Sequence, residues 1–158
     1  MTDKNEDRQY ALERMQILCS KSEKCTFDIE QKLDNYDLNE ADKEWIINKL
    51  KEEKFVNNER YAGFFVRDKF RFNKWGKLKI KQALFLKKIP ESIIQDALAQ
   101  IDQDEYYNLA SSLIQSKNKE IKDKNIFSRK ARLFRFAAQK GFEPDIIYPL
   151  LNDLTEEN

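Results

Sequence analysis

Hydrophobic positions recur along this chain with a long period. The sequence contains three Ile-Ile pairs, and each is followed closely by a leucine: Ile46-Ile47 by Leu50, Ile93-Ile94 by Leu98, and Ile146-Ile147 by Leu150. The intervals between the pairs are 47 and 53 residues. Self-similarity at such a period is typical of arrays built from one helical unit. The pattern therefore predicts three tandem repeats.

A second set of apolar positions lies upstream of each isoleucine pair, always with spacings of 4 and 5 residues. Its members are Ile29, Leu33 and Leu38, then Ile80, Leu84 and Ile89, and finally Leu133, Ala137 and Phe142. The gap from this set to the isoleucine pair is 8 residues in the first repeat and 4 in the others, so the first repeat carries a four-residue insertion. Farther upstream, another helix is marked by Tyr10-Ala11, by Tyr61-Ala62 and more weakly by Leu109-Ala110.

Each repeat is predicted to contain three short helices. They cover residues 5–19, 26–36 and 40–54, then 58–72, 76–87 and 90–101, and finally 104–116, 126–140 and 144–152. Asn57 suits an N-cap, Pro90 and Pro144 suit a first helical turn, and Gly141 suits a helix end. Pro149 falls inside the last helix, where we expect it to kink or stop the helix.

Three helices of this length bury little surface alone, so neighbouring repeats should stack on one another. We expect an all-α protein whose three tandem three-helix repeats form an elongated, curved array, right- or left-handed. The repeats are expected at residues 8–56, 57–102 and 103–154. We expect fraying in the N-terminal extension at residues 1–7 and in the acidic tail at residues 155–158.

Residues 73–91 test this helical interpretation, because charge and apolarity alternate strictly from Lys77 to Lys81, as in a half-buried strand. On a helix, however, Ile80 and Leu84 gather on one side as core residues. Lys74, Lys77, Lys81 and Lys88 then fall within an arc of about 60° and form a basic stripe, although Lys74 precedes the helix if it begins at Gly76. The repeat pattern favours the helix.

Charge is distributed unevenly, although the net charge is only +1. Between Arg60 and Lys88 there are ten basic residues and one acidic residue, and between Lys117 and Lys140 there are nine and two. Such regions are either ordinary solvent faces or a positive surface for phosphates or an acidic protein. The candidate contact residues are Arg67, Arg71, Lys74, Lys77, Lys79, Lys81 and Lys88 in the second repeat, and Arg129, Lys130, Arg132 and Arg135 in the third.

Aromatic residues are interleaved with these cations, namely Phe64, Phe65, Phe70, Phe72 and Trp75. Aromatic side chains in a basic region can stack on nucleic acid bases. Their helical spacing favours core packing instead.

Composition argues against an enzyme. The chain of 158 residues has no histidine, which removes the commonest general base and most zinc sites. Its 3 glycines stand apart, so there is no phosphate-binding glycine loop. We expect no catalytic residues, no cofactor and no metal. Cys19 and Cys25 are interpreted as ordinary reduced thiols, with a regulatory pair as the alternative.

The apolar runs are too short to span a bilayer, and residues 1–7 lack the apolar core of a secretory signal. We therefore expect a cytoplasmic protein with no membrane partner.

Residues 55–89, "FVNNERYAGFFVRDKFRFNKWGKLKIKQALFLKKI", resemble the signature segment of the RecX family of regulatory proteins. The shared features are a hydrophobic lead-in, an aromatic-alanine pair, a basic helix end, Gly76 and a basic second helix. "CTFDIEQKL" resembles the first repeat of the family, and "FAAQKGFEPDII" resembles the third. The resemblance covers residues 8–152, with departures: Asn57-Asn58 replaces an acidic pair, and Ile89 follows Lys88 without a glycine.

The resemblance implies a tandem repeat protein that binds the RecA filament and inhibits its ATPase, strand-exchange and co-protease activities. It implies a role in homologous recombination, DNA repair and the SOS response. We expect a monomer, with DNA as a further partner of the basic surface of repeats two and three. Two other classes stay open. A nucleic-acid-binding helical module would act without RecA, and a protein scaffold would use the concave face of the array.

Overall fold

The computed structural model describes residues 4–156, and within that range the chain forms nine α-helices and no strand. The helices are α1 (Lys4–Lys21), α2 (Thr26–Leu33), α3 (Glu40–Glu52), α4 (Asn58–Arg71), α5 (Lys77–Leu86), α6 (Glu91–Leu98), α7 (Gln103–Glu120), α8 (Ile126–Lys140) and α9 (Pro144–Glu156). All nine predicted helices are confirmed, and most of their ends agree to within three residues.

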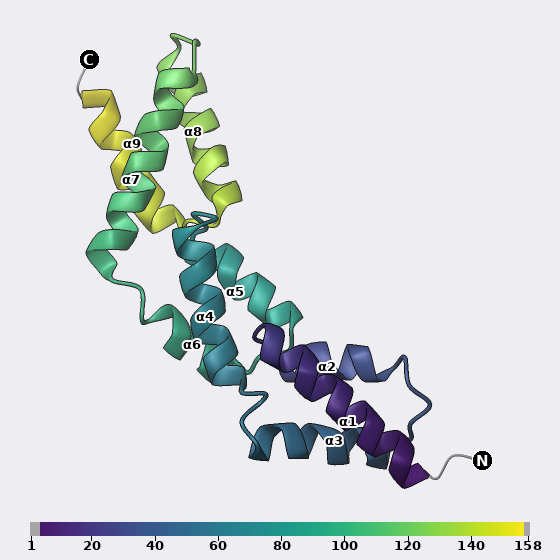
Figure 1. The fold of residues 1–158 in the computed structure, drawn as a ribbon. Coiled ribbons are helices and arrows are strands. Elements are labelled where there is room, and N and C mark those ends of the chain that lie inside the picture. The colour runs from purple at the N-terminus through teal and green to yellow at the C-terminus, as the bar shows by residue number, and fades with distance from the viewer. Residues whose placement is uncertain (1–3, 157–158) are drawn as a thin grey trace.

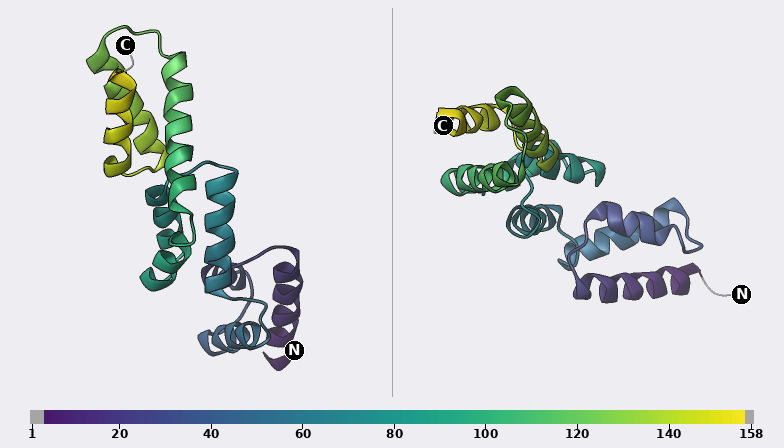
Figure 2. Two further views of the ribbon diagram at one scale, coloured as in Figure 1. Left: turned by 90° about the vertical axis from the view of Figure 1, so that its left-hand side faces the viewer. Right: turned by 90° about the horizontal axis from the view of Figure 1, so that it is seen from above.

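The helices form three successive groups, α1–α3, α4–α6 and α7–α9, arranged as an elongated and bent array (Figures 1 and 2). The most extensive helix contacts all lie within one group, such as α4 with α6 and α8 with α9. The buried residues likewise divide into three apolar clusters, one centred on each group, and Cys25 at the start of α2 joins the second cluster. The all-α architecture of stacked three-helix units is therefore confirmed.

The repeated apolar positions form these cores. Every member of the set with spacings of 4 and 5 is at most 4% exposed, except Leu38, which is only partly buried. The alanines of the upstream pairs, Ala11, Ala62 and Ala110, have no exposed surface, so each lies where neighbouring helices approach closely. One isoleucine of each pair is fully buried, and the other lies at the edge of the core.

The last helix departs from the prediction, because α9 continues through Pro149 to Glu156. Pro149 is the sixth residue of the helix and removes only one backbone hydrogen bond, near its start. The buried residues Ile147, Leu150 and Leu151 hold both sides of the proline against the third core. Helix α1 begins at Lys4 and α9 ends at Glu156, so both terminal segments expected to fray are partly helical. Residues 1–3 and 157–158 lie outside the described range.

Backbone atoms of two glycines join the second and third groups. Gly76, the N-cap of α5, donates its N–H to the carbonyl of Lys140 at 2.7 Å, and the Leu78 N–H donates to the carbonyl of Gly141 at 2.9 Å. A Cβ on Gly76 would lie 2.3 Å from the carbonyl carbon of Gly141. Gly141 ends α8 with φ +101°, a conformation that favours glycine. This joint has no room for a side chain on either residue.

Tyr106 of α7 reinforces the same joint from the side. Its hydroxyl accepts a hydrogen bond from the N–H of Lys77 at 2.9 Å and donates one to the Glu143 carboxylate. Its ring contacts those of Phe70 and Phe142, with centroid distances of 6.1 and 5.3 Å. Burial, together with the bond to Glu143, raises the Tyr106 pKa far above its usual value, so the hydroxyl keeps its proton.

Candidate partner-binding surface

The basic residues of the second repeat lie on α4, on α5 and in the turns that flank α5. Lys77 and Lys81 lie on α5, but Lys74 and Lys88 occupy turns with φ of 57° and 58° before and after it. The predicted stripe of four lysines is therefore not carried by one helix. The chain leaves the helix at Lys87, the C-cap, so Lys88 turns toward α2 and lies 5.5 Å from the ring of Phe27.

Most of these cations face aromatic rings and not carboxylates. Lys69 and Lys79 lie 5.0 and 4.6 Å from the centre of the Trp75 ring. Lys77 lies 4.8 Å from the ring of Tyr106, and Arg67 lies 4.7 Å from that of Phe64. An aromatic face attracts a cation without neutralising its charge.

Carboxylates compensate few of the predicted contact residues. Lys81 is an exception, because its ammonium lies 3.1 Å from the Glu91 carboxylate. Among the residues that the structure describes, Arg67, Arg71, Lys74, Lys77 and Lys79 have no carboxylate within ion-pair distance. Their positive charge remains available to a partner.

The aromatic residues of this region divide into two kinds. Phe65, Phe70 and Trp75 are partly buried against the second core, as predicted, but Phe64 is 45% and Phe72 80% exposed. For these two the prediction of core packing is wrong. Helix α4 packs through Tyr61, Ala62 and Val66, so Phe64 faces away, and Phe72 follows the last helical residue. Exposed aromatic side chains among cations are typical of protein interfaces.

The cations of the third repeat have different roles. Arg129 donates to the backbone carbonyls of Asp123 at 3.1 Å and Asn118 at 3.3 Å, so it closes the end of α7. Arg132 and Arg135 are exposed and line a cavity of about 680 Å³ together with Lys122 and the ring of Phe136. Lys122 and Lys69 were not selected from the sequence, because nothing local distinguishes them from other surface lysines.

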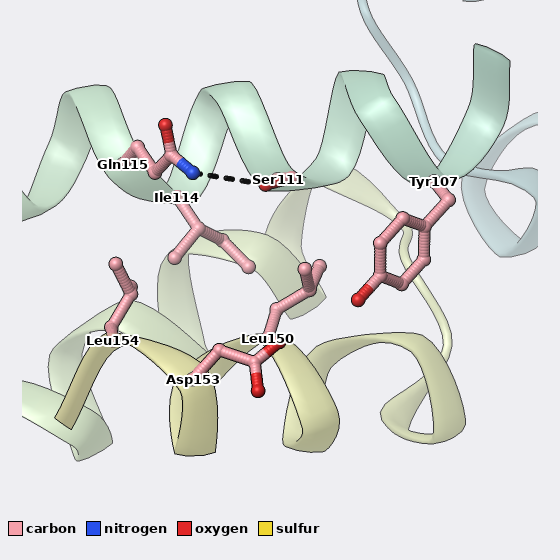
Figure 3. A pocket seen from close by; sticks show the side chains of 7 residues that line it. All are labelled: Tyr107, Ser111, Ile114, Gln115, Leu150, Asp153 and Leu154. Carbon is pink, nitrogen blue, oxygen red and sulfur yellow. Dashed lines mark hydrogen bonds between the residues drawn. The ribbon is translucent and has the colours of Figure 1, made fainter. Parts of the chain in front are cut away.

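A second cavity of the third repeat, of about 460 Å³, opens between α7 and α9 (Figure 3). Ile114 and Leu150 point toward each other across it, and Gln115 donates a hydrogen bond to Ser111 at 3.2 Å on its α7 side. Its lining includes Asp153 and no cation. The basic surface does not extend into it.

The two cysteines are unbonded. Burial raises the pKa of Cys25 to about 11, and the pKa of Cys19 is raised mainly for the same reason. Neither thiol ionises readily at neutral pH, which favours the interpretation as ordinary reduced thiols.

Two family models match this chain. The model described as RecX, second three-helix domain, matches residues 57–98, and the model described as RecX, third three-helix domain, matches residues 104–151. The chain belongs to the RecX family. It is 33% identical over 108 residues to a regulatory protein RecX of Clostridium perfringens strain 13, covering 67% of this chain and 50% of that protein. It is 25% identical over 153 residues to one of Bacillus cereus strain AH820, covering 97% and 57%.

Solved structures agree with this membership. A crystal structure of a regulatory protein RecX superposes with a TM-score of 0.84 and 27% identity, covering 93% of this chain and 73% of that chain. RecX from Lactobacillus salivarius superposes with a TM-score of 0.87 at 23% identity, covering 96% and 98%, which shows the shared fold. The chain spans about half the length of the RecX proteins of Clostridium perfringens and Bacillus cereus. None of the helices in residues 4–156 is long and apolar enough to cross a membrane.

Proposed function

We propose that this protein is a non-enzymatic regulator that binds the RecA recombinase filament as a monomer and inhibits its ATPase, strand-exchange and co-protease activities. Membership of the RecX family supports a regulatory role. The observation that carries the proposal is the set of cations in the second repeat that face rings and not carboxylates.

The elongated shape adds a physical reason. An extended array can contact several protomers of a helical filament at once, so modest contacts add up through multivalency. The contact residues proposed are Arg67, Arg71, Lys74, Lys77, Lys79, Lys81 and Lys88, with Lys130, Arg132 and Arg135 in the third repeat. Arg129 contributes by holding the α7–α8 turn beneath them.

A charge-reversal variant tests this proposal. Arg67, Arg71, Lys74 and Arg132 are exposed and make no ion pair within the described structure, so changing all four to Glu should leave the fold intact. Lys77 and Lys88 are left unchanged because they contact rings of other repeats. The control changes Arg14, Lys21, Lys32 and Lys51 of the first repeat to Glu; these side chains are also exposed, and the change in net charge is the same.

The measurement is the DNA-stimulated ATPase of RecA at increasing concentrations of each protein. We expect the first variant to lose inhibition and the control to keep it, with equal helical content by circular dichroism. Full inhibition by a folded first variant would contradict the proposal.

The alternative is a nucleic-acid-binding module that acts without RecA. The position of Trp75 between two lysines favours it, because a tryptophan flanked by cations suits base stacking beside phosphates. This alternative predicts that the protein alone binds single-stranded DNA with an affinity that falls steeply with salt. Loss of that binding on changing Trp75 to Ala, with RecA inhibition intact, would favour DNA as a separate partner.

A further inference from the structure

Helix α8 carries a second apolar strip besides the one that faces the core. Its members are Phe127, Ala131, Phe134 and Ala138, whose spacings of 4, 3 and 4 place them on one face of the helix. Phe127 is 84% exposed, and both alanines are exposed. The core residues Leu133 and Ala137 lie roughly 100° around the helix. Phe134 also packs against the third core, but Phe127, Ala131 and Ala138 are not needed to hold α8 in the third repeat.

The small alanines turn this strip into a groove. Tyr148 and Leu151 of α9 form its opposite wall, and the Phe134 and Tyr148 rings stack with centroids 5.0 Å apart. The cavity has a volume of about 880 Å³. From Phe127 to Ala138 the strip extends over about 16 Å of helix axis, which is three turns.

The charge around the groove has one sign. Lys130 and Arg135 of α8 line it, and its lining contains no carboxylate. Residues 126–140 as a whole contain five cations and no acid. In the described structure neither Lys130 nor Arg135 makes an ion pair. An apolar occupant with carboxylates at its margins would match both features of the groove.

We propose that this groove binds an amphipathic α-helix of a partner protein that carries Asp or Glu beside its apolar face. A helix suits the site because its side chains at i, i+4 and i+7 would enter the spaces above Ala131 and Ala138, while its carboxylates meet Lys130 and Arg135. This site goes beyond the proposed RecA-inhibiting surface, because its anchors are apolar residues of α8 and α9. Lys130 and Arg135 belong to both sites.

Binding is measured with a fluorescein-labelled peptide of about 18 residues, five turns of helix, with Leu at i, i+4, i+7 and i+11 and Glu at the adjoining positions. Two control peptides have the same composition in scrambled order, or Lys in place of Glu. The full chain is titrated in by fluorescence anisotropy. We expect saturable binding of the first peptide and binding about tenfold weaker or less for the controls, since an interface depends on a few central anchors and on matched charge.

The protein variant A131E/A138E fills the groove and offsets its two positive charges. Both positions are exposed, so the fold should persist. We expect at least about a tenfold loss of peptide affinity. The matched control A41E/S112E places the same charges on exposed helical positions of α3 and α7 and should bind like the wild type.

Three results would overturn the proposal: no saturable binding, equal binding of the scrambled peptide, or equal losses in the two double variants. Sedimentation would also show whether the chain forms a dimer. A dimer that the A131E/A138E variant cannot form, together with no peptide binding, would assign the groove to a second copy of the chain and overturn the proposal. Because RecA is absent from these assays, their failure is distinct from a failure of the proposed inhibition.

Discussion

Replacing Gly76 with Ala should separate the second repeat from the third. The added methyl group would lie 2.3 to 2.4 Å from three backbone atoms of residues 141 and 142, which cannot move like the end of a flexible side chain. The φ of Gly76 is −77°, which alanine adopts freely, so the whole effect comes from the contact.

The expected loss of stability follows from the hydrogen bonds between the two repeats that must break. Relief of the clash breaks the bonds from the N–H groups of Gly76 and Leu78, at 2.7 and 2.9 Å, and moves Lys77 away from the Tyr106 hydroxyl. At about 1 kcal/mol net for each hydrogen bond, the free energy of unfolding should fall by about 3 kcal/mol.

Gly63 supplies the control, because alanine there should fit. A Cβ on Gly63 would meet only the side-chain ends of Arg67 and Gln100, at 3.7 and 3.8 Å, and alanine favours a helix interior over glycine by about 0.5–1 kcal/mol. Urea unfolding should therefore show G76A destabilised and G63A equal to or above the wild type.

Amide hydrogen exchange would show which part of the chain loses stability in G76A. In G76A the amides of residues 76 and 78 should lose protection selectively, since their acceptors lie across the joint. Wild-type stability and unchanged protection of both amides in G76A would refute the close backbone contact.

Three further variants test other contacts by the same unfolding assay. Tyr106→Phe removes the hydroxyl that links Lys77 to Glu143 and should cost about 1–3 kcal/mol; no loss would contradict the link. Asp28→Asn should weaken the acid dependence of stability. Burial alone would raise the Asp28 pKa, but the hydrogen bonds from Lys87 and from a backbone N–H leave that pKa lowered. Asp28 therefore contributes to stability above the ordinary carboxyl pKa, and this contribution is lost as the pH falls through the pKa of Asp28 in the folded protein. An unchanged pH profile would contradict this. Pro149→Ala should stabilise α9 by about 1 kcal/mol or more, because it restores one N–H to an exposed helical position, and a loss would mean that the proline is needed.

The sequence was sufficient to predict the fold because helix faces follow directly from spacing. Ile29, Ile80 and Leu133 occupy the same position in successive repeats, and each is at most 3% exposed. Burial of one face is a property of a single helix and needs no knowledge of its neighbours. The exposure of Phe64 and Phe72 was missed because it depends on which side of α4 meets α5 and α6.

The candidate surface was less predictable. A count of charges located the basic region. The turns at Lys74 and Lys88, with φ of 57° and 58°, could not be predicted, and they take these two lysines off the arc projected on a helix. The pairs formed by Lys79 with Trp75 and by Lys77 with Tyr106 depend on rotamers and on contacts across the repeat joint. The outer strip of α8 follows from the spacing of its apolar residues, but the groove also needs Tyr148 and Leu151 of α9, whose position the spacing does not give.

The glycine joint also bears on how such arrays can be recombined. Because its central contacts are between backbone atoms, they do not depend on the identity of the surrounding side chains. A third repeat taken from another protein of this kind should dock at the same angle if it supplies an equivalent of Gly141 and of the Tyr106 hydroxyl to a second repeat that keeps Gly76. The contact between the repeats thus does not involve their outer surfaces. Surface residues can change in evolution while the angle between the repeats stays the same.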